Sequence, residues 1–321
     1  MQDKYRLLIS ICFAIITIII MSVFVQNSVA NSNLLHNNDS ATVSNSDNSQ
    51  TISSGNTSLR IFASFYPIYD FVEKIGKDKV DVSVIVPNGV EPHDFEPTSK
   101  QVVELQDADL IFINGAGFES WINGITNSNI VDLSRNITTE NITSNNPNPH
   151  IWLDPILVES MAEEIYNILV SVDPDNIAYY QNNLKQFNDN LELLNSNIKN
   201  NLTNCALNDF IAFHDAFSYF AKRYGLTQHV IGGVSPEMDV NPQKLTESIK
   251  LAKQLGITTI FSEDNVEPRL SNTIANEIGG KVLILSPIEM ITQKEQDLGK
   301  DYFSKMYDNL NNLKIALGCK N

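Results

Sequence analysis

The sequence is poor in basic residues, and this shortage narrows the kinds of ligand that the protein can bind. Lys and Arg together number 22 against 38 Asp and Glu, which gives a formal net charge of -16. An excess of negative charge disfavours a surface that binds phosphates, so we expect no nucleic-acid partner. A cationic ligand is more compatible with this composition, although acidity also serves solubility and does not identify a ligand by itself.

Cysteine is scarce as well, with three in the whole chain. Cys12 lies inside an apolar run and not at its end, so it is not placed like the lipid-modified cysteine of a lipoprotein. Cys205 and Cys319 could pair in an oxidising compartment, but the sequence leaves open whether they meet. Neither accompanies a histidine motif, which argues against a redox or electron-transfer metal site.

The N-terminus has the pattern of an export signal. Lys4 and Arg6 precede an uncharged apolar run over residues 7–25, and the small-residue sequence Ser28-Val29-Ala30 follows. The run is also long enough to cross a bilayer, so residues 1–30 are either a cleaved signal peptide or a membrane anchor. We therefore expect an exported protein, periplasmic or at the cell surface, with a possible membrane tether through residues 7–25.

The rest of the chain divides by composition. Residues 31–58 are rich in Ser, Asn and Thr and offer little apolar surface, which predicts a flexible linker. We expect an N-terminal lobe over residues 59–174, a linking helix over 175–201 and a C-terminal lobe over 202–321.

Short runs of Val, Ile and Phe alternate with amphipathic stretches from Leu59 onward, which indicates an α/β fold with parallel sheets in two matched lobes. Each half contains four expected strands: 59–65, 80–86, 110–114 and 130–133, then 210–213, 229–231, 259–262 and 281–285.

A long helix is predicted after Asp173-Pro174. Its apolar positions repeat at alternating spacings of three and four residues, at Ile177, Tyr180, Leu184, Phe187, Leu191, Leu194 and Ile198. This period indicates one helix of about 25 residues and roughly 37 Å, long enough to join both lobes. A coiled-coil dimer is the competing explanation of the stripe.

Three of the five histidines share a position relative to the expected strands. His93 follows the second strand in a loop shaped by proline and glycine, His150 follows a proline-broken loop, and His214 directly ends a strand. Ligands of open α/β sheets bind at the carboxyl ends of strands, so these histidines can converge between the lobes. Neutral imidazole suits zinc-like ions, and three rings with one oxygen donor complete a tetrahedron. His229 has no partner at ligand spacing, and we expect it to be structural.

Five segments carry a resemblance to a known family, namely Ser64-Phe65-Tyr66-Pro67-Ile68-Tyr69-Asp70, Glu91-Pro92-His93-Asp94-Phe95-Glu96-Pro97, His150-Ile151-Trp152-Leu153-Asp154-Pro155, His214-Asp215-Ala216-Phe217 and Gly232-Gly233-Val234-Ser235-Pro236-Glu237. In order and spacing the chain resembles, from Leu59 to Leu317, the ZnuA/TroA-like solute-binding proteins of zinc and manganese ABC transporters. The resemblance implies two β-α lobes joined by a long rigid helix, with the metal held between them. It also implies that His93, His150 and His214 are ligands, and that an ABC permease and its ATPase are partners.

The fourth ligand departs from the family pattern. Where relatives usually carry aspartate in a Leu-Asp-Pro run, this chain reads Leu285-Ser286-Pro287-Ile288-Glu289. A serine hydroxyl is a poor zinc donor, so we expect Glu289 to be the ligand, with water and then Glu263 as alternatives. Replacing Ser286 by alanine is then expected to leave zinc binding nearly unchanged.

The choice between Zn²⁺ and Mn²⁺ has two opposing signals. The resemblance implies zinc because manganese-binding members usually carry glutamate where this chain has His214. The loop from Asn136 to Pro149, which many zinc-specific members fill with histidines, contains only Glu140 as a charged metal donor. We expect zinc as the transported ion, with manganese as the alternative.

Two other classes of protein share part of this pattern. A zinc hydrolase also uses three histidines, but the sequence contains no His-Glu-x-x-His segment, so we expect no enzyme. An adhesin or scaffold with a structural metal is the second alternative.

Overall fold

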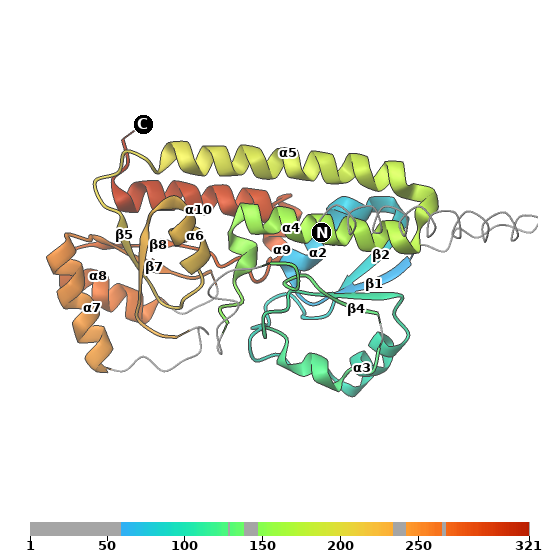
Figure 1. Ribbon diagram of the computed structural model, residues 1–321. Helices are drawn as coiled ribbons and strands as arrows, with labels where there is room; N and C mark the ends of the chain where they lie inside the picture. Colours follow the sequence, from blue (N-terminus) through green and yellow to red (C-terminus); the bar gives the residue numbers. More distant parts are fainter. Residues whose placement is uncertain (1–58, 128, 138–146, 234–241, 265–267, 321) are drawn as a thin grey trace, which may run out of the picture. The chain divides into compact units, whose positions relative to one another are not determined.

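Two parallel β-sheets with surrounding helices form the molecule, which confirms the predicted α/β class (Figure 1). The computed structural model describes residues 59–127, 129–137, 147–233, 242–264 and 268–320. The predicted linker and the export or anchor segment lie outside these residues. Among the described residues, no helix is both long and apolar enough to cross a membrane.

The two sheets have the same strand order. The first sheet runs β2-β1-β3-β4 and the second runs β6-β5-β7-β8, all parallel. The strands are β1 (Leu59–Ala63), β2 (Val80–Val84), β3 (Leu110–Ile113), β4 (Ile130–Asp132), β5 (Asp209–Ala212), β6 (Thr227–Val230), β7 (Thr259–Ser262) and β8 (Lys281–Ile284). All eight predicted strands are present, each within two residues of its predicted ends.

The central strands have the unbroken apolar sequences of strands covered on both faces. All four residues of β3 and of β7 are buried. In each sheet the chain order reverses between the two middle strands, which places a topological switch point at the carboxyl ends of the strands. Segments that leave those ends therefore gather where the two lobes meet.

Local capping signals fix several helix starts. Thr98 and Gln101 form a capping box at α3, Asp301 and Ser304 form one at α10, and Pro155 occupies the first turn of α4. The helices are α2 (Tyr66–Gly76), α3 (Ser99–Gln106), α4 (Pro155–Val172), α5 (Ile177–Asn201), α6 (Ser218–Tyr224), α7 (Pro242–Leu255), α8 (Arg269–Ile278), α9 (Gln293–Asp297) and α10 (Tyr302–Leu317).

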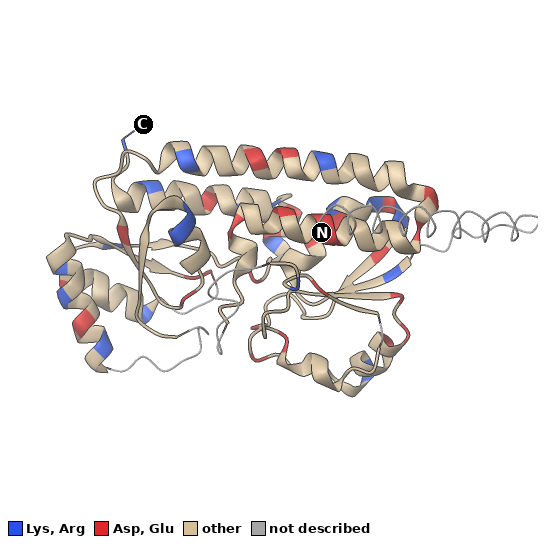
Figure 2. Cartoon of the chain, viewed as in Figure 1, with Lys and Arg blue, Asp and Glu red and all other residues tan. Residues whose placement is uncertain are grey.

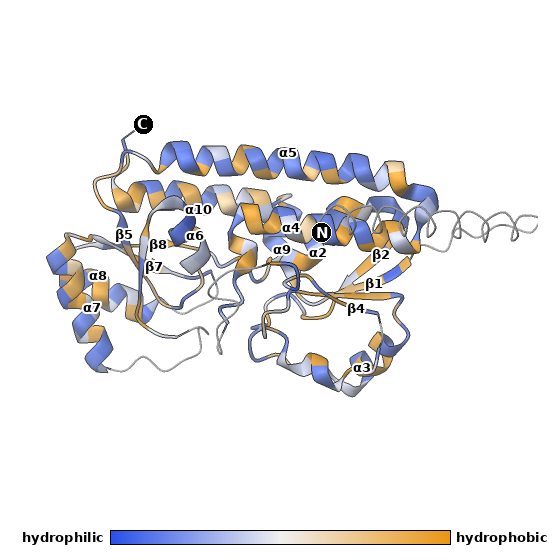
Figure 3. Ribbon diagram, in the orientation of Figure 1, coloured by the Kyte–Doolittle hydropathy of each residue, from blue (hydrophilic) through white to orange (hydrophobic). Residues whose placement is uncertain are grey.

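Helix α5 is the predicted long helix and has 25 residues. It packs against α2 and α4 from the first half of the chain and against α10 from the second, and Figure 1 shows it running along both lobes. Its stripe is buried within the chain from Tyr180 to Ile198, except that Leu184 is partly buried, while Ile177 at the first turn is 42% exposed. The hydropathy colouring in Figure 3 shows hydrophilic and hydrophobic residues alternating along α5. Packing inside one chain accounts for the stripe, and a coiled-coil dimer is not needed to explain it.

A single large hydrophobic core includes residues of both sheets, among them Ile61 and Phe261, and a smaller cluster lies around Ile211. Because the core is continuous, the lobe boundaries at 174 and 202 remain a prediction. Figure 2 shows Asp and Glu interspersed with Lys and Arg along α5 and α7.

The two cysteines whose pairing the sequence left open form a disulfide, Cys205–Cys319, across a sequence separation of 114. Backbone hydrogen bonds flank it, from the Leu207 N–H to the Leu317 carbonyl at 3.0 Å and from the Lys320 N–H to the Asn204 carbonyl at 2.9 Å. The C-terminal end is thus fastened next to the start of β5.

Candidate metal centre

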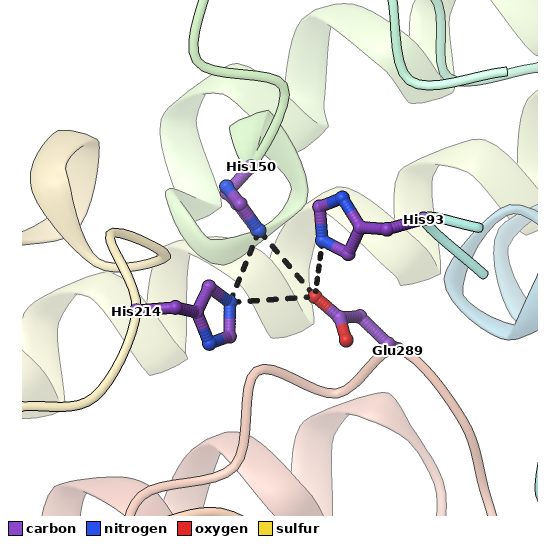
Figure 4. A group of neighbouring side chains, drawn as sticks. All are labelled: His93, His150, His214 and Glu289. Carbon is purple, nitrogen blue, oxygen red and sulfur yellow. Dashed lines mark hydrogen bonds and ion pairs between the residues drawn. The ribbon is translucent and has the colours of Figure 1, made fainter. Parts of the chain in front are cut away.

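Four side chains converge where the two lobes meet: His93, His150, His214 and Glu289 (Figure 4). His93 lies in the loop after β2, and His150 immediately precedes a short 3-10 helix, Ile151–Leu153, that leads into α4. His214 follows β5, and Glu289 lies in the loop between β8 and α9. Each half of the chain therefore contributes two of the four groups that the sequence analysis singled out.

Four of the six distances between the donor atoms are close to the edges of a small tetrahedron. Glu289 Oε1 lies 3.2 Å from His93 Nε2, 3.4 Å from His150 Nε2 and 3.6 Å from His214 Nε2. The Nε2 atoms of His150 and His214 are 3.2 Å apart. A tetrahedral ion with ligands at about 2.0 to 2.1 Å has ligand–ligand edges of roughly 3.3 to 3.4 Å. All four atoms lie within 4.8 Å of one another, so a modest shift of the side chains would let them coordinate one ion.

The four side chains are largely shielded from solvent. The side chains of His150, His214 and Glu289 are 0%, 2% and 3% exposed, whereas that of His93 is 10% exposed. The His93 ring packs edge-on against Phe118 at 4.7 Å. His93 is therefore the most accessible of the four side chains.

Asn148 fixes the orientation of the His150 ring. Its Oδ1 accepts the His150 backbone N–H at 3.0 Å, which identifies that atom as the oxygen, and it lies 2.8 Å from His150 Nδ1. The Nδ1 atom must then donate, so Nε2 directs its lone pair into the site. The Asn148 Nδ2 group donates to the Asp215 carbonyl at 2.6 Å and to Ser218 Oγ at 3.1 Å. This asparagine thereby ties the His150 loop to the segment that follows His214.

Glu263 plays the corresponding role for His214. Its Oε1 lies 2.7 Å from His214 Nδ1 on the side of the ring away from the cluster. A carboxylate in that position holds the ring and leaves Nε2 facing the site. Glu263, the last alternative for the fourth ligand, therefore contacts the far side of the His214 ring and is not one of the four clustered donors.

Ser286 does not face the donor cluster. Its Oγ donates to Asp264 Oδ2 at 2.5 Å and accepts the Ile288 N–H at 3.1 Å. The next carbonyl, that of Pro287, accepts the indole N–H of Trp152 at 2.7 Å, which joins the Glu289 loop to the segment just after His150.

The buried charges perturb one another. Burial favours a neutral His214, but hydrogen bonds and charge from Glu263 and Glu289 outweigh it and raise the pKa of His214 to about 10. Burial lowers the pKa of His150 to about 3. The three neighbouring rings overcome the effect of burial on Glu289 and hold its pKa well below the usual value. Without metal, the pair of a protonated His214 and an ionised Glu289 thus occupies the site.

Glu91 lies next to the cluster, whereas His229 does not. Glu91 accepts the His93 backbone N–H at 3.1 Å, and burial together with the charge of Glu289 raises the pKa of Glu91 to about 7. His229 lies outside the cluster, with Nε2 2.7 Å from Asp209 Oδ1, which agrees with the structural role expected for it.

Sequence reasoning missed Asn148, although an asparagine two residues before a candidate histidine is a usable signal for a ring partner.

Comparison with known proteins agrees with this architecture. The family described as zinc-uptake complex component A, periplasmic (ZnuA), matches residues 61–316. The chain belongs to this family. The high-affinity zinc uptake system protein ZnuA of Bacillus subtilis (strain 168) is 33% identical over 297 residues, covering 86% of this chain and 93% of that protein. The family assignment confirms the resemblance found in the sequence motifs.

Solved structures of similar proteins extend the comparison to the fold. The Zn(II)-bound ZnuA-like domain of Streptococcus pneumoniae AdcA has a TM-score of 0.73 at 28% identity, covering 81% of this chain and 99% of that one. The laminin-binding protein Lmb of Streptococcus agalactiae, described as a bifunctional protein with adhesin and metal-transporting activity, has a TM-score of 0.75 at 32% identity, with the same coverage. The two-lobed fold is therefore the fold of metal-binding transport components.

Proposed function

We propose that this protein captures Zn²⁺ outside the cytoplasm with His93, His150, His214 and Glu289 and delivers it to an ABC permease and its ATPase. The single observation that carries the proposal is the convergence of three Nε2 atoms and one carboxylate oxygen within 4.8 Å of one another. Both ring partners at Nδ1, Asn148 and Glu263, support it because they leave Nε2 free to coordinate.

The donor set favours zinc over manganese. Three imidazole nitrogens and one carboxylate oxygen at tetrahedral spacing suit Zn²⁺, whereas Mn²⁺ prefers more oxygen donors in an octahedral shell. The names of the similar proteins, a zinc uptake protein and a Zn(II)-bound domain, support the same choice.

The filled shell supports metal binding over catalysis. Catalytic zinc sites keep one position open for water or substrate, whereas four protein donors here close the tetrahedron. We therefore propose a binding protein without enzymatic activity. A membrane tether through residues 7–25 would keep it near its permease and raise the effective concentration of loaded protein there.

Metal analysis is the direct test. Protein purified without added metal and then equilibrated with equimolar Zn²⁺ and Mn²⁺ should retain about one zinc per chain. Retention of manganese in preference to zinc, or no bound metal, would contradict the proposal. Growth of a deletion strain at limiting zinc, restored by added zinc, is the matching test of uptake.

Adhesion is a second candidate, because the similar Lmb protein is described as both adhesin and metal transporter. The two activities are compatible in one chain. Binding of the zinc-loaded protein to immobilised laminin, compared with the same protein after chelation, would show whether adhesion exists and whether it depends on the metal.

A further inference from the structure

The loop that carries Glu289 has an unusual backbone. Ile288 adopts φ of 58°, in the left-handed region that a β-branched residue rarely occupies. Strain of this kind persists only where surrounding contacts enforce it, and it gathers at functional sites. The residues that hold this backbone in place therefore determine where the Glu289 carboxylate points.

One end of the loop is fastened through Asp264. The Ser286 hydroxyl donates to Asp264 Oδ2 at 2.5 Å, and the same carboxylate oxygen accepts from Lys305 Nζ at 2.7 Å. Within the turn, the Ile288 N–H donates to Ser286 Oγ at 3.1 Å. The strained residue is thus connected to a buried ammonium group through two hydrogen bonds and an ion pair.

The other end of the loop is fastened to the same ammonium group through Glu295. Lys305 Nζ lies 2.9 Å from Glu295 Oε1, and Glu295 Oε2 accepts both the N–H and the hydroxyl of Thr292 at 2.8 Å. Glu289 lies between the two fastened points, Ser286 and Thr292.

Helix α10 makes this arrangement rigid. The side chain of Lys305 is 3% exposed, so its charge is compensated by the two carboxylates and not by water. Asn309, one turn further along the helix, accepts the Ser286 N–H and donates to the Ser286 carbonyl, each at 2.7 Å. A cavity of about 430 Å³ is lined by residues of this network, among them Ser286, Lys305 and Asn309.

We propose that Lys305, acting through Asp264 and Glu295, is the positioning residue that holds both ends of the 286–292 loop and so aims the Glu289 carboxylate at the three histidines. Ser286 connects Asp264 to the strained turn, because its hydroxyl donates to Asp264 and accepts the Ile288 N–H. The proposal rests on the proposed zinc site and replaces the expectation that Ser286→Ala is nearly silent.

The test is the zinc affinity of variants, measured by competition with a chelator. Changing a partner behind a metal ligand typically costs 10- to 100-fold in affinity, and we expect about tenfold or more for Lys305→Met. Ser286→Ala, which keeps the buried charges in place, should lose several-fold, and Ser286→Thr should recover most of that loss because it restores the hydroxyl.

A double-mutant cycle separates positioning from general destabilisation. If these residues act on zinc only through Glu289, adding Ser286→Ala or Lys305→Met to Glu289→Gln should cause no further loss of affinity. Lys74→Met is the matched control, because Lys74 also pairs with two carboxylates, Asp70 and Asp301, but does not contact the loop. It should lower thermal stability and leave zinc affinity unchanged.

The outcomes are distinct. Unchanged affinity in both Ser286→Ala and Lys305→Met, with zinc bound normally by the wild type, would overturn this inference and leave the zinc site intact. Full additivity in the Glu289→Gln background would also overturn it. Failure of the wild-type protein to bind zinc would instead contradict the proposed function. If Lys305→Met does not fold, Ser286→Ala and its cycle decide the question alone.

Discussion

His214 determines how zinc binding responds to pH. Its pKa of about 10 lies above the ordinary value of 6.5, so in the metal-free protein its ring is protonated at pH 8. Coordination requires a neutral ring, and zinc must displace that proton. His150, whose pKa is lowered to about 3, is already neutral and releases none.

We therefore predict that zinc binding at pH 8 releases about one proton and that affinity rises with pH up to about pH 10. Calorimetry in buffers of different ionisation enthalpy measures the number of protons released. The measurement is made at pH 8 because this lies above the pKa of Glu91, which is raised to about 7. In Glu263→Gln the count should fall, because the carboxylate that raises the pKa of His214 is gone. A count near zero in the wild type would contradict the assigned protonation.

Each histidine of the cluster should be required for binding. Replacing His93, His150 or His214 by alanine removes one of four donors, and we predict a loss of zinc affinity of about tenfold or more in each case. His229→Ala is the control, since that ring also pairs with a carboxylate but lies outside the cluster. Calorimetry that finds unchanged affinity for any one of the three would remove that residue from the site.

At the scale of secondary-structure elements, the disulfide joins the end of α10 to the segment between α5 and β5. Closing a loop with a sequence separation of 114 restricts the unfolded chain, and we predict that the paired change Cys205→Ser with Cys319→Ser lowers the free energy of unfolding by up to about 4 to 5 kcal/mol. Zinc affinity should stay the same, because neither cysteine lies in the cluster. Equilibrium denaturation and chelator competition on the same preparations test both halves of the prediction.

The elements themselves could be predicted because local patterns specify them. Runs rich in Val and Ile predicted the strands, and the alternating spacing of three and four residues predicted α5. The three histidines were identified by their positions relative to the expected strands. Strand ends were less accurate, since β1 stops at Ala63 and the chain turns directly into α2. Proline at the first turn of α2 provided a signal for that turn.

Long-range partners could not be predicted, because tertiary packing alone brings them together. His214 and Glu263 are 49 residues apart, and Lys305 and Asp264 are 41 apart, with no motif that links either pair. The expectation that Ser286→Ala leaves zinc binding nearly unchanged took no account of its bonds to Asp264 and Asn309, because those bonds depend on where α10 lies. A single sequence identifies donors to a metal more readily than the groups that aim them.

On the scale of the whole molecule, the metal centre joins segments that are remote in the chain. His93 and His150 follow strands of one sheet, while His214 and Glu289 follow strands of the other. The unfolded chain cannot hold these four donors together, so zinc binds the native state and shifts the folding equilibrium toward it.

We therefore predict that zinc raises the thermal unfolding midpoint. At a free concentration 100 times the dissociation constant, the stabilisation is about 2.7 kcal/mol, which corresponds to roughly 5 to 10 °C for a protein of this size. Chelation should reverse the shift, and Glu289→Gln should reduce it in proportion to its loss of affinity. Calorimetric scans at several zinc concentrations check this, because the midpoint should keep rising with the logarithm of free zinc. A midpoint that stays constant while zinc is bound would mean that the unfolded chain binds the ion as tightly as the native state does, which would contradict a site whose four donors only the fold brings together.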